Sequence, residues 1–246
     1  MDEMIEKRKA ATVLIAAVIV SLALGVGLTK VGSGFATRSS DGIIVIGSAK
    51  VDAKADKAVW TLSIQNNGRT PASAVTGIDS GINAVQKYLV DGGIKSDQLT
   101  LGAISSYPTE EYINGNPTGR ILNYRASREI TVRTKDVQLV SKLSQNIGSL
   151  LQLGVNVSNY GPQYYVSTLN KIRPELLSQA TKDAKDRAAA MTKAVGGKVG
   201  SITSVKAGPI QVTTPDSTMT SDYGMYDTSS IDKTVTATVT VTFKSN

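Results

Sequence analysis

Residues 233–244 read KTVTATVTVTFK and set valine or alanine against threonine over eight consecutive positions. Valine and threonine are β-branched, and a period of two places the two residue types on opposite faces of an extended chain. This stretch is the strongest strand signal in the chain, so a β-sheet with one apolar face is the first expectation for the fold.

Further strands are predicted upstream of this stretch. Residues 43–51 (IIVIGSAKV) and 58–65 (AVWTLSIQ) favour strands, and the second alternates cleanly. Longer strands are expected at 99–107 and 121–134, joined by a linker whose Asn-Gly and Asn-Pro pairs mark turns. These two strands are predicted to form a protruding hairpin. The remaining predicted strands are 155–166 and 199–207.

Three helices are predicted between the strands. The first has a capping Thr70, an apolar stripe at spacings of three and four, and two glycines at its end. A short helix is expected from Asp136 to about Gly154, and the longest over 170–195. Together these patterns predict the α+β class, with mixed or antiparallel sheets and three helices. Residues 208–231, rich in Ser, Thr, Gly, Pro and Asp, are predicted to form a long exposed arm.

The N-terminal region predicts export from the cytoplasm. Residues 10–29 carry no charge and are long enough for a membrane-spanning helix or a signal helix. Basic residues precede this stretch and a single lysine follows it, so residues 1–9 are expected in the cytoplasm. A tether over 30–42 would then lead to a folded domain over 43–246. Cleavage near residue 36 is the alternative, with the domain secreted.

Small residues recur every four positions inside the apolar stretch. Ala17, Ser21 and Gly25 would line one face of a helix and allow close approach of a second helix in the membrane. They are the predicted helix-helix contact, although small residues are common in such helices.

The composition excludes several classes of chemistry. The chain has no cysteine and no histidine, which removes disulfides, thiolate nucleophiles and the usual ligands of transition metals. The formal net charge of +7 lies beyond the apolar stretch, but no basic run interleaved with aromatics indicates nucleic-acid binding. We expect no cofactor, no metal and no nucleic-acid partner.

Candidate chemical motifs are weak. Glu110 and Glu111 are adjacent carboxylates, but an exposed hairpin gives neither the apolar pocket that acid-base catalysis needs. Ser230 and Lys233 have the S-x-x-K spacing, but in a strand their side chains would diverge. The aspartates of the arm lack the spacing of a calcium loop. We therefore expect no enzymatic activity.

The order of these elements resembles the SIMPL-domain family, the group that includes the periplasmic immunogenic proteins. The matching stretches are IIVIGSAKV, GGIKSDQLT, SSYPTEEY, ASREITVRTKD, MTKAVGGKVGSI and VTATVTVTF. One departure is Ala55-Asp56, where family members often carry Pro-Asp. The resemblance implies an α+β domain with three helices that assembles into symmetric oligomers, and no catalytic residues are carried over.

The sequence thus favours a membrane-tethered, extracytoplasmic homo-oligomer that acts by assembly or binding, with a role in envelope stress tolerance implied by the resemblance. A ligand- or carbohydrate-binding module, a carboxylate-based enzyme and a surface adhesin stay open. Tyrosine offers large contact area with a polar tip, so the contact between copies is expected on the two protrusions. The candidate interface residues are Tyr107, Glu110, Glu111, Tyr112, Tyr223, Met225 and Tyr226.

Overall fold

The computed structural model describes residues 20–26 and 42–245. Residues 20–26 are helical, and within the described residues no helix is long and apolar enough to cross a membrane. Most of the predicted membrane or signal helix, including Ala17, and nearly all of the predicted tether lie outside the described residues. Ser21 and Gly25 lie in the short helical stretch.

The chain divides into two compact units. The terminal unit comprises Met1–Gly47, Thr181–Lys206 and Val239–Asn246, and the central unit comprises Ser48–Ala180 and Ala207–Thr238. Strand β1 (Ile43–Lys54), helix α5 (Leu169–Ala194) and strand β11 (Asp232–Ser245) each contribute residues to both.

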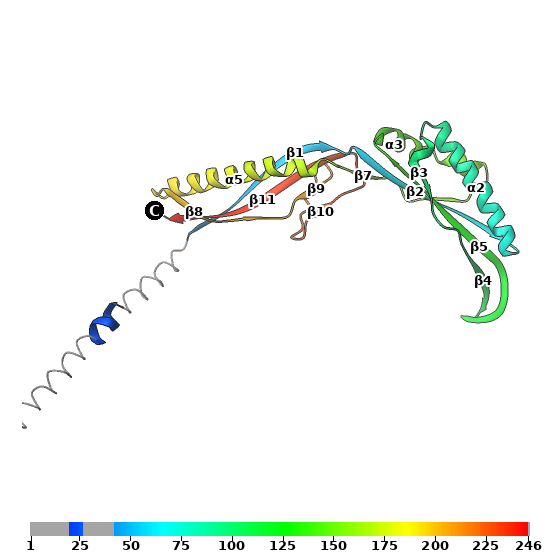
Figure 1. The fold of residues 1–246 in the computed structure, drawn as a ribbon, viewed down its shortest axis with the longest axis horizontal. Helices are drawn as coiled ribbons and strands as arrows, with labels where there is room; N and C mark the ends of the chain where they lie inside the picture. Colours follow the sequence, from blue (N-terminus) through cyan, green and yellow to red (C-terminus); the bar gives the residue numbers. More distant parts are fainter. Residues whose placement is uncertain (1–19, 27–41, 246) are drawn as a thin grey trace, which may run out of the picture. The chain divides into compact units, whose positions relative to one another are not determined.

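The central unit contains a six-stranded sheet (Figure 1). Its order is β3 (Leu99–Leu101), β5 (Asn116–Thr134), β2 (Lys57–Gly68) and β6 (Val157–Asn159). Strand β4 (Ser105–Ile113) pairs with β5, and β7 (Gln163–Tyr165) pairs with β2. All of these pairings are antiparallel.

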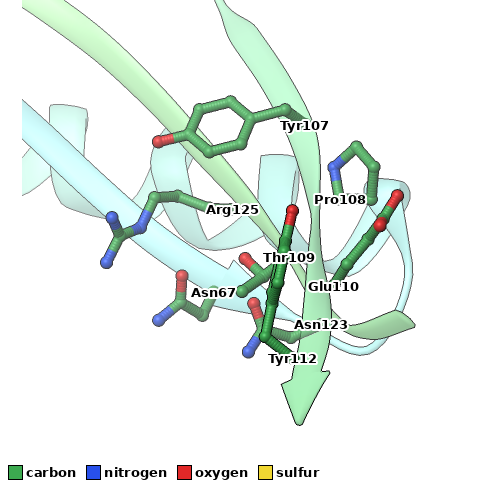
Figure 2. Close-up of a pocket in the computed structure, with 8 residues that line it drawn as sticks. All are labelled: Asn67, Tyr107, Pro108, Thr109, Glu110, Tyr112, Asn123 and Arg125. Carbon is green, nitrogen blue, oxygen red and sulfur yellow. The ribbon is translucent and has the colours of Figure 1, made fainter. Parts of the chain in front are cut away.

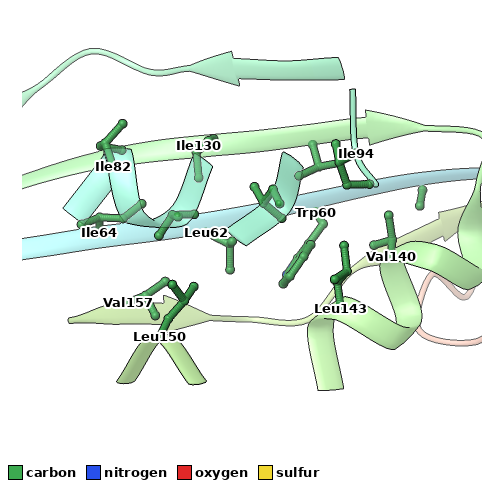
Figure 3. Close-up of a cluster of buried hydrophobic side chains, with 14 of the residues drawn as sticks. Trp60, Leu62, Ile64, Ile82, Ile94, Ile130, Val140, Leu143, Leu150 and Val157 are labelled. Atoms are coloured by element: carbon green, nitrogen blue, oxygen red, sulfur yellow. The ribbon is translucent and has the colours of Figure 1, made fainter. Parts of the chain in front are cut away.

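Strand β2 separates an apolar face from a polar one. Ala58, Trp60, Leu62 and Ile64 are buried, while the residues between them lie on the other face. Figure 3 shows this apolar row packed with side chains of the helices, and the Trp60 indole N–H donates to Asn159 Oδ1 at 2.8 Å. Because the buried indole donor is satisfied, the largest core side chain carries no polar penalty.

Helix α2 (Pro71–Asp91) covers the apolar face and follows the predicted pattern. Thr70 accepts from the Ser73 N–H while the Ser73 hydroxyl accepts from the Thr70 N–H, a reciprocal cap. Gly93 follows with a φ of 105°, a conformation that favours glycine. The buried residues of α2 are Ala74, Ile78, Gly81, Ile82, Val85 and Leu89.

The helix predicted from Asp136 to about Gly154 is divided into two helices. Within the described residues there are four α-helices from α2 onward, so the prediction of three was wrong. Helix α3 (Val137–Gln145) and helix α4 (Gly148–Gln152) are separated at Asn146. Its amide donates to the Lys142 carbonyl at 2.8 Å and its own carbonyl accepts from the Ser149 N–H. These bonds end one helix and begin the next while the apolar spacing continues.

The predicted strand 155–166 is also divided, into β6 and β7. Gly161 has a φ of 81° and Pro162 follows it, so the ladder to β2 is interrupted between the two strands. The Gly161 N–H donates to Asn159 Oδ1, the same oxygen that Trp60 uses.

The second sheet contains β1, β11, β9 (Gln211–Thr213) and β10 (Met225–Tyr226) in that order, with β8 (Val199–Ala207) also paired to β11. On β11 the buried residues are Val235, Ala237, Val239, Val241 and Phe243, as the alternation predicts. In the central unit Leu176 of α5 packs with Val212, Val235 and Ala237.

Residues 208–231 are not the long exposed arm that the sequence predicted. Gln211, Val212 and Thr213 of β9 are buried, and β10 pairs with β9 in parallel. These strands could not be predicted from the sequence, because they are only three and two residues long and show no repeating pattern. Most of its exposed residues lie between β9 and β10.

Candidate functional site

The hairpin of β4 and β5 contains a cleft of about 550 Å³. Its position follows from the register, since Tyr107 pairs with Arg125, and Arg125 pairs with Asn67 of β2. The lining residues are Asn67, Tyr107, Pro108, Thr109, Glu110, Tyr112, Asn123 and Arg125. Two tyrosine rings, two amides and one guanidinium therefore share one surface.

An irregularity in β4 brings the tyrosines together. Tyr107 and Tyr112 are five positions apart, so in a regular strand they would face opposite sides. The register with β5 shifts on both sides of Glu110, which re-aims Tyr112. In Figure 2 Tyr107, Tyr112 and Arg125 lie on one side of β4, while Pro108 and Glu110 lie on the other.

The cleft is polar at its base and open to solvent. The Oδ1 atom of Asn123 is buried, and no described residue donates to it. Buried carbonyl oxygens nearly always have a donor, so this atom is an unused acceptor in the lining of the cleft. Tyr107 and Tyr112 stay half exposed or more, which leaves their rings available for contact.

The two adjacent carboxylates do not form a pair. Glu110 lines the cleft, but Glu111 does not: its carboxylate accepts from Arg120 at 3.3 Å and from the Thr118 hydroxyl at 3.1 Å. Glycosidase-type chemistry needs two carboxyl groups facing one bond. Within the described lining, Glu110 is the single carboxylate of the cleft.

Apolar side chains continue from the cleft to the end of the hairpin. Large exposed residues on β4 and β5 are Tyr107 (49%), Tyr112 (63%), Ile113 (58%), Ile121 (45%) and Leu122 (50%). A strand pair with solvent on both sides has no internal reason to carry so many apolar residues. Such a group of side chains is typical of a contact with another protein surface.

The arm residues of the predicted interface serve different purposes. The Tyr226 hydroxyl accepts from the Val166 N–H at 2.9 Å, and its ring packs 6.0 Å from that of Tyr165. Met225 is half buried on β10, whereas Tyr223 is 99% exposed. Tyr226 and Met225 therefore help to hold the segment in place, and Tyr223 is free for external contact.

The hairpin and the arm are separate surfaces within the central unit. Strand β7, which receives the arm through a bond from the Tyr164 N–H to the Thr228 carbonyl, pairs with β2 near Lys57. The hairpin cleft lies beside Asn67, ten residues along β2. At about 3.3 Å per residue these points are about 33 Å apart, so the predicted anchors do not form one patch.

Ser230 and Lys233 come together, and the prediction that their side chains diverge was wrong. Lys233 Nζ lies 3.4 Å from Ser230 Oγ, because a turn precedes β11 and folds back toward Asp227. The ammonium is wholly buried and donates to the Asp227 carboxylate at 2.6 Å and to its carbonyl at 2.7 Å. A lysine held in an ion pair cannot accept the serine proton, so this cluster holds the arm and offers no nucleophile.

The aspartates of the arm are not gathered around a cation position. Asp227 is occupied by Lys233, and the Asp232 carboxylate lies 3.5 Å from Lys54. Among the described residues no group of three or more acidic side chains is placed to hold a metal ion.

A comparison with protein families identifies the family of this chain. The model of the SIMPL family, described as a protein of unknown function (DUF541), matches residues 43–243. This chain belongs to the SIMPL family. The membership was expected from the order of the strands and helices, and the match begins where β1 begins.

Two curated relatives of this SIMPL chain carry the name 26 kDa periplasmic immunogenic protein. One comes from Brucella melitensis biotype 1 and the other from Brucella abortus (strain S19). Each is 26% identical over 162 residues, which cover 63% of this chain and 63% of the relative. The aligned region thus spans less than two thirds of either protein.

Solved structures show only partial likeness. An amidase of the hydantoinase/carbamoylase family from Burkholderia vietnamiensis is 15% identical, with a TM-score of 0.25, over 48% of this chain and 30% of the amidase. The de novo designed protein Foldit4 is 10% identical, with a TM-score of 0.22, over 45% of this chain and 98% of the design. These scores carry no functional argument.

The sequence pointed to the tyrosines and glutamates of the hairpin but missed Asn67, Asn123 and Arg125. Their contribution depends on the pairing of β2 with β5, which joins residues more than fifty positions apart. The alternation of β2 could have predicted that Asn67 lies on the polar face, but it could not have predicted that Asn67 pairs with Arg125 of β5.

Proposed function

We propose that this SIMPL protein acts outside the cytoplasm as a membrane-tethered, self-assembling protein without enzymatic activity, and that the β4–β5 hairpin is the contact between copies. The observation that carries the proposal is the set of five large, exposed apolar side chains on the hairpin. Burying them against a second copy would stabilise an assembly by about 25 cal/mol for each Å² of apolar surface removed from water.

The location outside the cytoplasm is supported by two independent observations. The basic residues before the apolar stretch and the near absence of them after it favour export of everything downstream. The two Brucella relatives are named as periplasmic proteins. A role in envelope stress tolerance is a finer part of the proposal and rests on the family resemblance.

The absence of enzymatic activity is supported by the two clusters that looked most like catalytic groups. Glu111 is tied to Arg120, which leaves Glu110 without a second carboxylate in the cleft. Lys233 is tied to Asp227, which leaves Ser230 without a base. Glu111 and Lys233 each take part in an ion pair within the chain, which accounts for their positions.

The decisive experiment is a mass measurement of the full chain in a nonionic detergent by sedimentation velocity. We expect the wild type to have several times the mass of one chain. Replacing Tyr112 and Leu122 together by serine should shift the population to smaller species, because both side chains lose their contact area. Circular dichroism should stay unchanged, since both side chains are exposed.

A matched control is Leu153→Ser, which removes an exposed leucine of the central unit outside the hairpin. This variant should keep the full mass. A monomeric wild type, or a double hairpin variant with undiminished mass, would show that the hairpin is not the contact.

The cleft itself favours a second candidate, the binding of a carbohydrate-like ligand. Aromatic rings beside amide groups, with an unused acceptor at Asn123, suit a ligand with apolar faces and hydroxyl donors. The same mass measurement separates the two candidates, because ligand binding does not require more than one chain.

A further inference from the structure

A second cavity, of about 710 Å³, lies at the end of the sheet opposite to the hairpin cleft. It forms where β2 begins and β5 ends, next to the start of α3. The lining residues are Asp56, Lys57, Gln98, Arg133, Thr134, Lys135, Asp136 and Ser167. Three basic side chains and two acidic ones therefore surround one space, and none of them belongs to the hairpin surface.

The three basic residues lie where β2 begins and β5 ends. Arg133 pairs with Val59, Lys57 is the first residue of β2, and Lys135 directly follows the last residue of β5. Ala58 and Thr134, which lie between them in the chain, are buried and pair with each other. The adjacent ends of two paired strands thus bring three positive charges to one cavity.

The two acidic residues of the cavity are already engaged by hydrogen bonds to other parts of the chain. Asp56 accepts from the Ser167 N–H at 2.7 Å and from the Ser167 hydroxyl at 2.6 Å. The hydroxyl bond is the main reason why the pKa of Asp56 lies below its usual value, and the charge of Lys135 adds to this effect. Asp136 caps α3 by accepting from the Leu139 N–H at 2.9 Å.

The basic side chains have no such partners. Within the described residues, none of Lys57, Arg133 and Lys135 makes an ion pair. Like charges at neighbouring positions of paired strands repel each other. With three basic and two acidic side chains in the lining, the cavity keeps one net positive charge, and an anion in it would be attracted.

We propose that this cavity binds a phosphate group. Arg133 supplies a planar fork that matches two phosphate oxygens, and Lys57 and Lys135 supply point charges on either strand. A tetrahedral phosphate group presents oxygens in several directions, which suits cations from three positions around the cavity, whereas a carboxylate presents two oxygens in one plane. The ligand is either a soluble phosphate compound or the headgroup of an anionic phospholipid.

The experiment is isothermal titration calorimetry of the full chain in a nonionic detergent. Inorganic pyrophosphate represents the soluble source, and dihexanoyl phosphatidylglycerol represents the lipid source, with dihexanoyl phosphatidylcholine as its uncharged counterpart. We expect saturable binding of at least one of the two anionic probes. Pyrophosphate alone would identify a soluble ligand, and phosphatidylglycerol alone would identify a lipid headgroup.

Two arginine variants separate a specific site from general attraction. Arg133→Gln should weaken binding by about tenfold or more, because it removes charge-assisted hydrogen bonds to the phosphate. Arg69→Gln makes the same change at an exposed arginine directly after the other end of β2, in the lining of neither cavity, and should leave the affinity unchanged. Equal losses in both variants, or no binding of either anionic probe, would overturn the proposal. The result is independent of the hairpin contact, which is measured as mass.

Discussion

Lys233 fixes the segment that precedes β11 through one buried ammonium group. Its three hydrogen-bond acceptors are the carboxylate and carbonyl oxygens of Asp227 and the hydroxyl of Ser230. Asp227 in turn accepts from the N–H and hydroxyl groups of Ser229 and Ser230. The ammonium therefore has every donor satisfied, which is the condition under which a charge is tolerated inside a protein.

Removal of the carboxylate charge should destabilise the fold. Asp227→Asn leaves Lys233 buried without its counter-ion, and the free energy of unfolding is expected to fall by about 3 kcal/mol in urea denaturation at neutral pH. Adding Lys233→Met should recover most of this loss, because no charge then remains buried. Asp216→Asn, an exposed change in the same segment, should stay within about 0.5 kcal/mol of the wild type.

The pH dependence of this pair tests the same argument. Partial burial acts to raise the pKa of Asp227, but the bonds from Lys233, Ser229 and Ser230 outweigh it and lower the pKa to about 2 from 3.8. Because the folded pKa is the lower one, the contribution is present above pH 3.8 and is lost as the pH falls toward about 2. The gap between the wild type and Asp227→Asn should close over this window, and a gap that persists at pH 2 would contradict the assignment.

At the scale of elements, the long periodic segments were predictable and the short ones were not. Helix α2 and strands β2 and β11 are at least twelve residues long and carry a repeating pattern over eight residues or more, so the sequence was sufficient. Strands β9 and β10 are too short for any period and exist through their pairing with each other and with β11. The division of α3 from α4 rests on one asparagine whose side chain bonds the preceding turn.

The residues of the two candidate sites were likewise predictable only in part. Tyr107 and Tyr112 were recognisable as residues that a simple turn does not need, yet their position on one face depends on a register shift that the sequence does not show. Arg133 lies in a predicted strand, and Lys57 and Lys135 lie one residue outside the predicted strands 58–65 and 121–134. Their convergence appears once those strands are paired.

The exposed segment between β9 and β10 can be shortened without loss of the fold. Replacing residues 215–223 by a six-residue Gly-Ser linker keeps β9, β10 and Asp227, and such a linker reaches up to about 20 Å, enough to reconnect two neighbouring parallel strands. The midpoint of thermal unfolding should change by less than about 4 °C.

A wider deletion provides the contrast. Replacing residues 213–228 would remove β10, Tyr226 and Asp227, which leaves Lys233 buried without any acceptor from Asp227. Cooperative unfolding should then be lost in circular dichroism. If the wider deletion unfolds as cooperatively as the shorter one, the arm residues do not hold the fold together.

At the scale of the whole molecule, the central unit carries two surfaces of different chemistry. The apolar hairpin suits a contact between copies, and the cationic cavity suits an anion. They lie at opposite ends of β2, so occupation of one does not block the other. The proposed assembly through one end would therefore leave the other end open for the proposed phosphate compound or headgroup.

The proposed location of the folded domain outside the cytoplasm is simple to measure, because the chain has no cysteine. Ser39→Cys places a single thiol in the predicted tether, which lies outside the described residues, and an impermeant thiol reagent should label it on intact cells. Glu3→Cys, on the other side of the apolar stretch, should react only after lysis if that stretch stays in the membrane. Labelling of Ser39→Cys only after lysis would place the domain in the cytoplasm and remove the basis of the proposed location, whereas loss of the N-terminal thiol from the mature chain would indicate a cleaved signal and a secreted domain.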